Sequence, residues 1–112
     1  MSQVTTHILD TTRGVPAGGV SISMYEKAGL EWIEVASGIT DSDGRIKDLL
    51  KPDVILPLGT YKMHFAVKEY FKIHGMEVFY PFVDIIFDIR SKEHYHIPLL
   101  LNPFGYSTYR GS

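Results

Sequence analysis

The sequence is divided into short segments in which apolar and polar residues alternate, and this period of two is typical of β-strands. The clearest segment is residues 60–67 (TYKMHFAV), where Lys62 and His64 alternate with large apolar side chains. Residues 20–25 (VSISMY) and 83–90 (VDIIFDIR) repeat the pattern. Glycine, proline and aspartate stand between these segments and mark turns. The chain is therefore expected to pair short strands rather than to pack long helices.

The number and order of such segments predict the fold class. One short helix is expected over residues 68–75 (KEYFKIHG), where good helix formers are followed by a glycine. Pro103 and Gly105 occupy the preferred positions of a type I turn that would join the last two strands. The sequence predicts an all-β protein with one short helix, a β-sandwich of seven to eight strands, in a single domain over residues 1–112. Strands are expected at residues 4–10, 20–25, 30–37, 60–67, 83–90, 95–101 and 106–112.

The composition excludes several classes of protein. The chain has no cysteine, so disulfides, thiol nucleophiles and zinc–thiolate sites are excluded. A net charge of -2 does not suggest a nucleic-acid partner. No segment approaches the roughly 18 consecutive apolar residues of a membrane span. The opening MSQVTTHILD lacks the basic and apolar regions of a secretory signal. A cytoplasmic protein that binds neither nucleic acid nor membranes is expected.

Two histidines, His7 and His96, lie in otherwise apolar strand segments. Imidazole exchanges protons near neutral pH, which suits acid–base catalysis. Taken alone, each histidine would more often be a satisfied buried residue, such as one bonded to a backbone carbonyl. His94 and His96 are two residues apart on one expected strand, so their side chains share a face and could form half of a metal site. Because no further ligands accompany them, no metal site is predicted.

Arg45 follows an Asp-Gly turn in the segment TDSDGR, residues 40–45. A solvated turn arginine is the simpler interpretation, but a guanidinium also binds planar anionic or carbonyl-rich ligands through two parallel hydrogen bonds. The DSDG stretch is similar to the start of a calcium loop, yet Arg45 and Pro52 stand where that loop needs ligands. Nucleophile and phosphate-loop motifs are absent from the sequence. The residues alone therefore indicate a β-sandwich with a candidate His/Arg site.

The last four residues, YRGS, resemble the C-terminal signature of the 5-hydroxyisourate hydrolases, the transthyretin-like enzymes of urate breakdown. THILDTTRGVPAGGV (residues 6–20) is similar to that family's N-terminal strand and loop. TDSDGR is similar to its Asp-Gly-Arg turn, and HYHIPLLLNPFGYSTYRGS (residues 94–112) to its C-terminal hairpin. The resemblance covers essentially the whole chain.

This resemblance implies a fold, a reaction and an assembly. The implied fold is a transthyretin-like sandwich, and the implied assembly is a homotetramer with active sites in channels where two dimers meet. The implied reaction is hydrolysis of an amide-type C–N bond in 5-hydroxyisourate, a small purine-derived substrate, to the carboxylated ureidoimidazoline OHCU. Neither a metal nor an organic cofactor is implied.

The resemblance also implies site residues. Arg45 would bind the carbonyl oxygens of the substrate, and one histidine would take a proton from the attacking water. The other histidine would protonate the departing nitrogen or orient the substrate, and which histidine does which stays open. Ser112 would contribute a hydroxyl and a carboxylate. The expected catalytic residues are His7, Arg45, His96 and Ser112, and the expected substrate-binding residues are His7, Arg45, Tyr109 and Arg110.

Two other functions remain open. A transthyretin-type carrier would have the same fold and a channel that binds a hormone-like ligand without catalysis. A purely structural or interaction sandwich would bind no ligand. His7, Arg45, His96 and the YRGS end favour the hydrolase, because a carrier channel has no need of this acid–base set.

Overall fold

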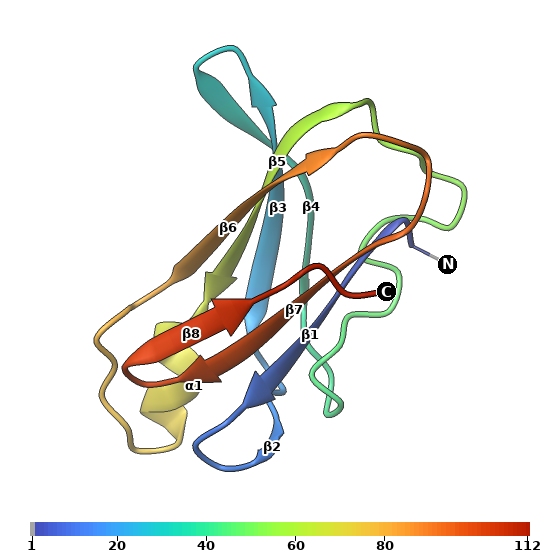
Figure 1. The fold of residues 1–112 in the computed structure, drawn as a ribbon. Helices are drawn as coiled ribbons and strands as arrows, with labels where there is room; N and C mark the ends of the chain where they lie inside the picture. The colour runs from blue at the N-terminus through green and yellow to red at the C-terminus, as the bar shows by residue number, and fades with distance from the viewer. Residues whose placement is uncertain (1) are drawn as a thin grey trace.

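Two β-sheets packed face to face make up the computed structural model, which describes residues 2–112 (Figure 1). One sheet has the strand order β2-β1-β7-β8 and the other β4-β3-β5-β6. These eight strands and one helix confirm the expected all-β sandwich. The elements are β1 (Val4–Asp10), β2 (Val15–Pro16), β3 (Ser21–Ala28), β4 (Glu31–Ile39), β5 (Gly59–Ala66), α1 (Val67–Ile73), β6 (Val83–Ile89), β7 (Tyr95–Asn102) and β8 (Gly105–Thr108).

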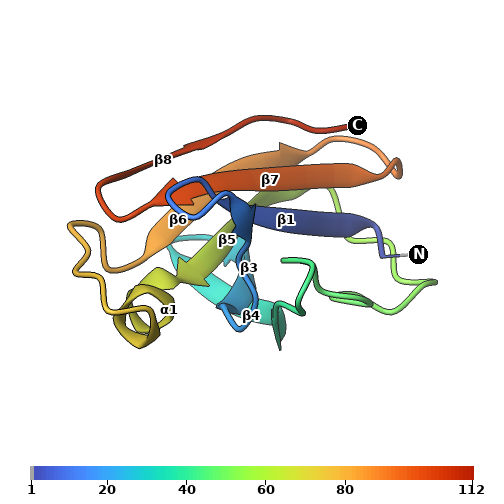
Figure 2. The same cartoon turned by 90° about the horizontal axis from the view of Figure 1, so that it is seen from below.

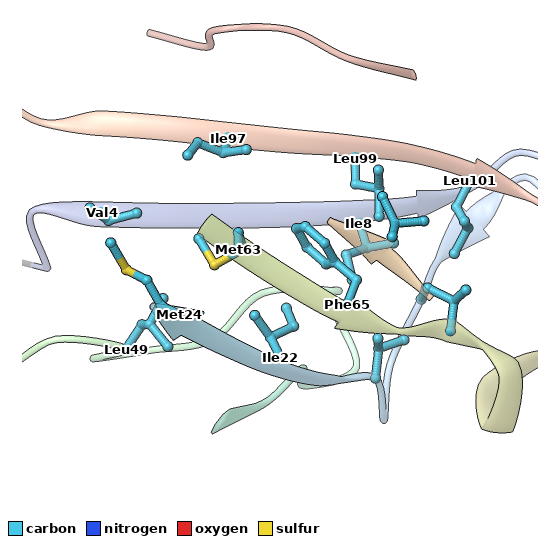
Figure 3. Packing of buried hydrophobic residues seen from close by; sticks show 14 of the residues in the cluster. Val4, Ile8, Ile22, Met24, Leu49, Met63, Phe65, Ile97, Leu99 and Leu101 are labelled. Carbon is cyan, nitrogen blue, oxygen red and sulfur yellow. The ribbon is translucent and has the colours of Figure 1, made fainter. Parts of the chain in front are cut away.

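The core lies between the two sheets, because each central strand turns alternate side chains inward (Figure 3). Ile8 and Leu99 from one sheet meet Ile22 and Phe65 from the other, and all four are almost completely buried. Burial of each such side chain stabilises the fold by about 1.5–3 kcal/mol. The alternation that fills the core also fixes which residues of each strand face outward.

The first sheet is centred on a parallel pair, β1 and β7, which run side by side although about ninety residues separate them (Figure 2). Thr5 lies opposite His96, and His7 lies opposite Pro98. Because the buried positions of β1 alternate with Thr5, His7 and Leu9, these half-buried side chains lie on the outer face of the sheet. This register brings the two histidine-bearing segments together.

The last strand is shorter than expected: β8 ends at Thr108 rather than continuing to residue 112. Pro98 of β7 lies opposite residue 109 in the register of the hairpin, and its ring nitrogen has no hydrogen to donate. Thr108 instead donates its hydroxyl to the Pro98 carbonyl at 2.7 Å. Pairing resumes in the same register as an isolated bridge between His96 and Gly111. The proline therefore separates the last residues from the sheet and lets them return beside His96.

The two sheets are open along one side, where β8 is the edge of the first sheet and β6 the edge of the second. Large apolar side chains on or beside these edges are exposed, among them Phe82, Ile86, Phe104 and Tyr106. Exposed strand edges that carry apolar groups favour pairing with another chain.

Within residues 2–112, no helix has both the length and the apolar character needed to cross a membrane.

Candidate active site

His7 comes from β1 and is half-buried on the outer face of the first sheet. Its main chain forms an isolated antiparallel bridge with Arg45, so the two residues are neighbours although they are far apart in sequence. The contact is reinforced on the next residue, where the Ile8 amide donates to the Gly44 carbonyl at 2.9 Å. The loop that carries Arg45 is thus bound directly to the strand that carries His7.

The turn before Arg45 is fixed by Asp41 and Gly44. The Asp41 carboxylate accepts hydrogen bonds from the amides of Asp43 and Arg45, at 2.9 and 3.1 Å. Gly44 has a φ of 73°, and a Cβ at this position would lie 2.5 Å from the carbonyl oxygen of Ile8. Only glycine fits this conformation and this close approach. The Asp-Gly pair recognised in the sequence therefore places Arg45, whose side chain is exposed, at the edge of β1.

His96 is half-buried on β7, beside Thr5 of β1. The hydroxyl oxygen of Thr5 lies 2.8 Å from Nδ1 of His96 and 2.7 Å from Nε2 of His94. The rings of His94 and His96 stack with their centroids 6.2 Å apart, so the two histidines share a face as the sequence predicts.

The surroundings of His96 favour its neutral form. Burial is the largest cause that lowers the pKa of His96, and the positive charge of Arg45 is the next. His94 and His7 act in the same direction, and a hydrogen bond with the Thr5 main chain opposes them. A neutral imidazole at neutral pH has a lone pair available, so His96 can accept a proton.

The chain end packs against His96. The Gly111 amide donates to the His96 carbonyl at 2.9 Å, and a Cβ at position 111 would lie 2.5 Å from Cδ2 of the imidazole. Glycine at this position therefore lets the main chain lie directly on the ring. Ser112 follows immediately and reaches the same pocket as Arg45.

A pocket of about 390 Å³ lies where these segments meet, and it is lined by Thr5, Arg45, Lys47, His96 and Ser112 among others. Its lining has two cationic side chains and two imidazoles, since His94 also contributes. Such a lining suits a small ligand rich in carbonyl oxygens or negative charge. His7 does not line this pocket, but it pairs with Arg45 and lies close enough to His96 to contribute to the lowered pKa of that ring.

Tyr109 and Arg110 are placed elsewhere. They line a second pocket of about 470 Å³ that opens between β6 and β8 and touches the first pocket at His96. Arg110 donates to the Glu93 carboxylate at 2.6 Å and stacks over the Tyr95 ring, 4.5 Å from its centroid. Of the sequence-predicted residues, His7, Arg45, His96 and Ser112 thus lie together, whereas Tyr109 and Arg110 face the neighbouring cavity.

Sequence reasoning missed Thr5 and Lys47 and set His94 aside. The alternation of β1 places Thr5 on the same face as His7, but the strand that would lie beside it is not visible in the sequence. In residues 2–112, no group of three or more His, Cys, Asp or Glu side chains is arranged to hold a metal ion. The two stacked histidines are bonded to Thr5 instead.

Comparisons with known proteins identify the family and the fold. The model of the HIUase/Transthyretin family matches residues 4–111. A 5-hydroxyisourate hydrolase from Mus musculus is 45% identical over 114 residues, which cover 99% of this chain and 96% of that protein. The structure of Klebsiella pneumoniae 5-hydroxyisourate hydrolase superposes with a TM-score of 0.84 at 35% identity, covering 97% of this chain and 98% of that chain.

Transthyretin itself has the same fold. Sea bream transthyretin, in a structure of its complex with thyroxine, superposes with a TM-score of 0.91 at 32% identity. That match covers 98% of this chain and 95% of the sea bream chain. The same fold is therefore found in a 5-hydroxyisourate hydrolase and in a transthyretin solved with thyroxine, so the fold alone does not decide between these functions. The two sheets, the single short helix and the match over residues 4–111 show that this chain belongs to the HIUase/transthyretin family.

Proposed function

We propose that this protein hydrolyses 5-hydroxyisourate to OHCU, the reaction of the hydrolases it resembles. The observation that carries the proposal is the meeting of Arg45, His96 and Ser112 around one small pocket, with His7 against Arg45. These residues come from four separate parts of the chain. A flat, carbonyl-rich substrate requires cationic groups for its oxygens and a base for water, and the pocket supplies both.

The proposed mechanism begins with binding by Arg45, whose guanidinium would hold substrate oxygens and stabilise the negative charge that develops during attack. His96 is the proposed base, because its lowered pKa keeps it neutral and able to take a proton from water. The hydroxide adds to the carbonyl carbon, the C–N bond breaks, and the departing nitrogen takes up a proton. His7 would supply that proton or orient the ring, and Ser112 would hold the water or His96.

Tyr109 and Arg110 stay proposed substrate-binding residues. In the subunit described here they line the second pocket, on the other side of His96. A contact with substrate in the first pocket would need a substrate that extends past His96 or a second subunit that supplies these side chains.

We further propose a homotetramer with active sites where two dimers meet. Support comes from the open edges of β6 and β8, which carry exposed apolar side chains such as Phe82 and Ile86. The pocket is also incompletely enclosed, since Arg45 and Ser112 are both exposed. A second subunit over the pocket would exclude water and strengthen the electrostatic contacts inside. Sedimentation of the purified protein tests this assembly.

The proposed compartment is the cytoplasm.

The rival function is a transthyretin-type carrier, favoured by the superposition on sea bream transthyretin. Two measurements, the decay of 5-hydroxyisourate and the binding of thyroxine, distinguish the hydrolase from the carrier. Enzymatic oxidation of urate yields 5-hydroxyisourate, whose ultraviolet absorbance decays slowly without a catalyst. We expect the purified protein to accelerate that decay strongly at neutral pH. An unchanged decay rate together with tight binding of thyroxine would instead establish the carrier.

A further inference from the structure

The hydroxyl of Thr5 lies between two imidazoles. Its oxygen is 2.8 Å from Nδ1 of His96 and 2.7 Å from Nε2 of His94, and both distances are those of good hydrogen bonds. His96 is half-buried in the pocket, whereas His94 is exposed at its rim. In residues 2–112 the other ring nitrogen of His96, Nε2, has no hydrogen-bond partner and is left for substrate or water.

One hydroxyl has a single hydrogen, so it can donate to only one of the two nitrogens. The other nitrogen must then carry a proton and donate to the Thr5 oxygen. If Thr5 donates to His94, the proton of neutral His96 is on Nδ1, and Nε2 has a free lone pair. If Thr5 instead donates to Nδ1 of His96, the proton of neutral His96 is on Nε2. The two hydrogen bonds therefore link the tautomer of His96 to that of His94.

We infer that Thr5 and His94 are positioning residues of the proposed hydrolysis, in which the Thr5 hydroxyl holds His96 as the Nδ1–H tautomer and relays its proton to His94. The inference rests on the proposed function, because it gives His96 the role of base. It adds two residues that the family resemblance did not bring to the site.

The proton balance of the relay is complete. His96 Nε2 takes a proton from the attacking water, and the ring becomes an imidazolium. Its Nδ1 proton passes to the Thr5 oxygen as the Thr5 hydrogen passes to Nε2 of His94. His96 is then neutral with its proton on Nε2, Thr5 is unchanged, and His94 has both nitrogens protonated. The reverse transfers return the proton to His96 Nε2, which releases it to the departing nitrogen if His7 only orients the ring, or to solvent if His7 has protonated that nitrogen.

The charges around His96 explain why the proton would move from His96 to His94. Arg45, His94 and His7 lie close enough to lower the pKa of this ring, and Lys47 lines the same pocket; each is cationic or can become so. On the side of the chain end, the Arg110–Glu93 pair is neutral overall, and among the described residues that line the pocket the Ser112 carboxylate is the one negative group that opposes these cations. A positive charge on half-buried His96 is therefore unfavourable, whereas exposed His94 keeps its charge in contact with water.

The test removes the hydroxyl without changing the shape of the side chain. Thr5→Val eliminates both hydrogen bonds, Thr5→Ser keeps them, and Thr60→Val removes a hydroxyl that bonds to Asp88 on the other sheet. Nitrogen-15 NMR of the free protein reports the tautomer and the titration of His96. In the wild type, Thr5→Ser and Thr60→Val proteins we expect the Nδ1–H tautomer. In Thr5→Val we expect the Nε2–H form and a kcat about tenfold lower.

His94→Gln gives a second measurement. It should lower kcat by about tenfold and change the pH dependence of kcat, while leaving KM near the wild-type value. If Thr5→Val leaves the nitrogen-15 shifts of His96 and the pH profile unchanged, the inference is wrong. The NMR comparison needs no substrate. A wild-type protein without hydrolase activity would refute the proposed function, and the tautomer of His96 in Thr5→Val would still decide whether Thr5 controls that ring.

Discussion

The main chain of Gly111 lies directly against the imidazole of His96, so closely that a Cβ on residue 111 would be 2.5 Å from Cδ2 of the ring. The amide of the same glycine donates to the carbonyl oxygen of His96 at 2.9 Å. Because Pro98 interrupts the β7–β8 ladder, this contact is the place where the chain end rejoins the sheet. The last residues therefore form one wall of the site and restrict the base that we propose.

Gly111→Ala should displace the His96 ring and lower kcat/KM by at least about tenfold. The fold should lose little stability, because residue 111 is outside the core cluster. Gly105→Ala is the matched control, since a Cβ there meets its nearest atoms at 3.8 and 3.9 Å. Steady-state rates and thermal unfolding of both variants check this. Equal activity in the two variants would mean that the contact does not position His96.

The lowered pKa of His96 predicts how activity depends on pH. The neutral base persists below about pH 6.5, the ordinary pKa of imidazole, so kcat/KM should begin to fall only at more acid values. The pKa of His96 is lower in the folded protein than in the unfolded chain, so the folded protein binds fewer protons at this ring. The contribution of His96 to the free energy of unfolding is therefore present above about pH 6.5 and is lost as the pH falls below that value. Arg45→Gln should raise the pKa of His96, measured by NMR titration. A pKa that stays constant in this variant would exclude Arg45 as a cause.

Gly44→Ala should destabilise the protein for two reasons, the positive φ and the collision with the Ile8 carbonyl oxygen at 2.5 Å. Gly14 also has a positive φ, of 70°, but a Cβ there meets nothing within 4 Å. Gly14→Ala should therefore cost only the conformational strain, about 1–2 kcal/mol. Urea unfolding should show a clearly larger loss for Gly44→Ala, together with lower activity because Arg45 moves. Equal losses would show that the close approach relaxes without cost.

Removal of residues 109–112 should abolish activity and leave the fold intact. Strand β8 ends at Thr108, so the deletion keeps all eight strands and the core. It removes the contact with His96 and the Ser112 side of the pocket. Circular dichroism and sedimentation should show a folded tetramer without hydrolase activity. A truncated protein with full activity would refute the role given to the chain end.

Most of the fold follows from local sequence patterns. The β-branched residues of segment 4–10 predict β1 with its observed bounds, and alternation predicts β6 to within one residue. The pattern over residues 30–37 is less regular, and the observed strand β4 runs from Glu31 to Ile39. Its pairing with β3 shifts register between Met24 and Tyr25, where β4 bulges. The helix begins and ends earlier than expected, at Val67 and Ile73. Such shifts of one or two residues are common at the ends of short elements, which fray.

The site is less accessible to sequence reasoning. The resemblance identifies His7, Arg45 and His96, but the parallel pairing that places Thr5 opposite His96 depends on contacts between distant segments. The expected strand over residues 106–112 was wrong beyond Thr108, because a proline on the neighbouring strand ends the ladder. That same break turns Tyr109 and Arg110 toward the second pocket. Residues 106–112 alone predict neither the end of β8 at Thr108 nor the orientation of Tyr109 and Arg110.

The central claim is that His7, Arg45 and His96 act on one substrate. The most direct measurement is the rate of 5-hydroxyisourate decay with the wild-type protein and with His7→Ala, Arg45→Ala and His96→Ala, each at equal concentration. His64→Ala is the control, because His64 lies on the outer face of the other sheet in a pair with Asp84. The account predicts a loss of about a hundredfold or more in each of the three site variants and wild-type activity in the control. Site variants that hydrolyse the substrate as fast as the control would contradict it.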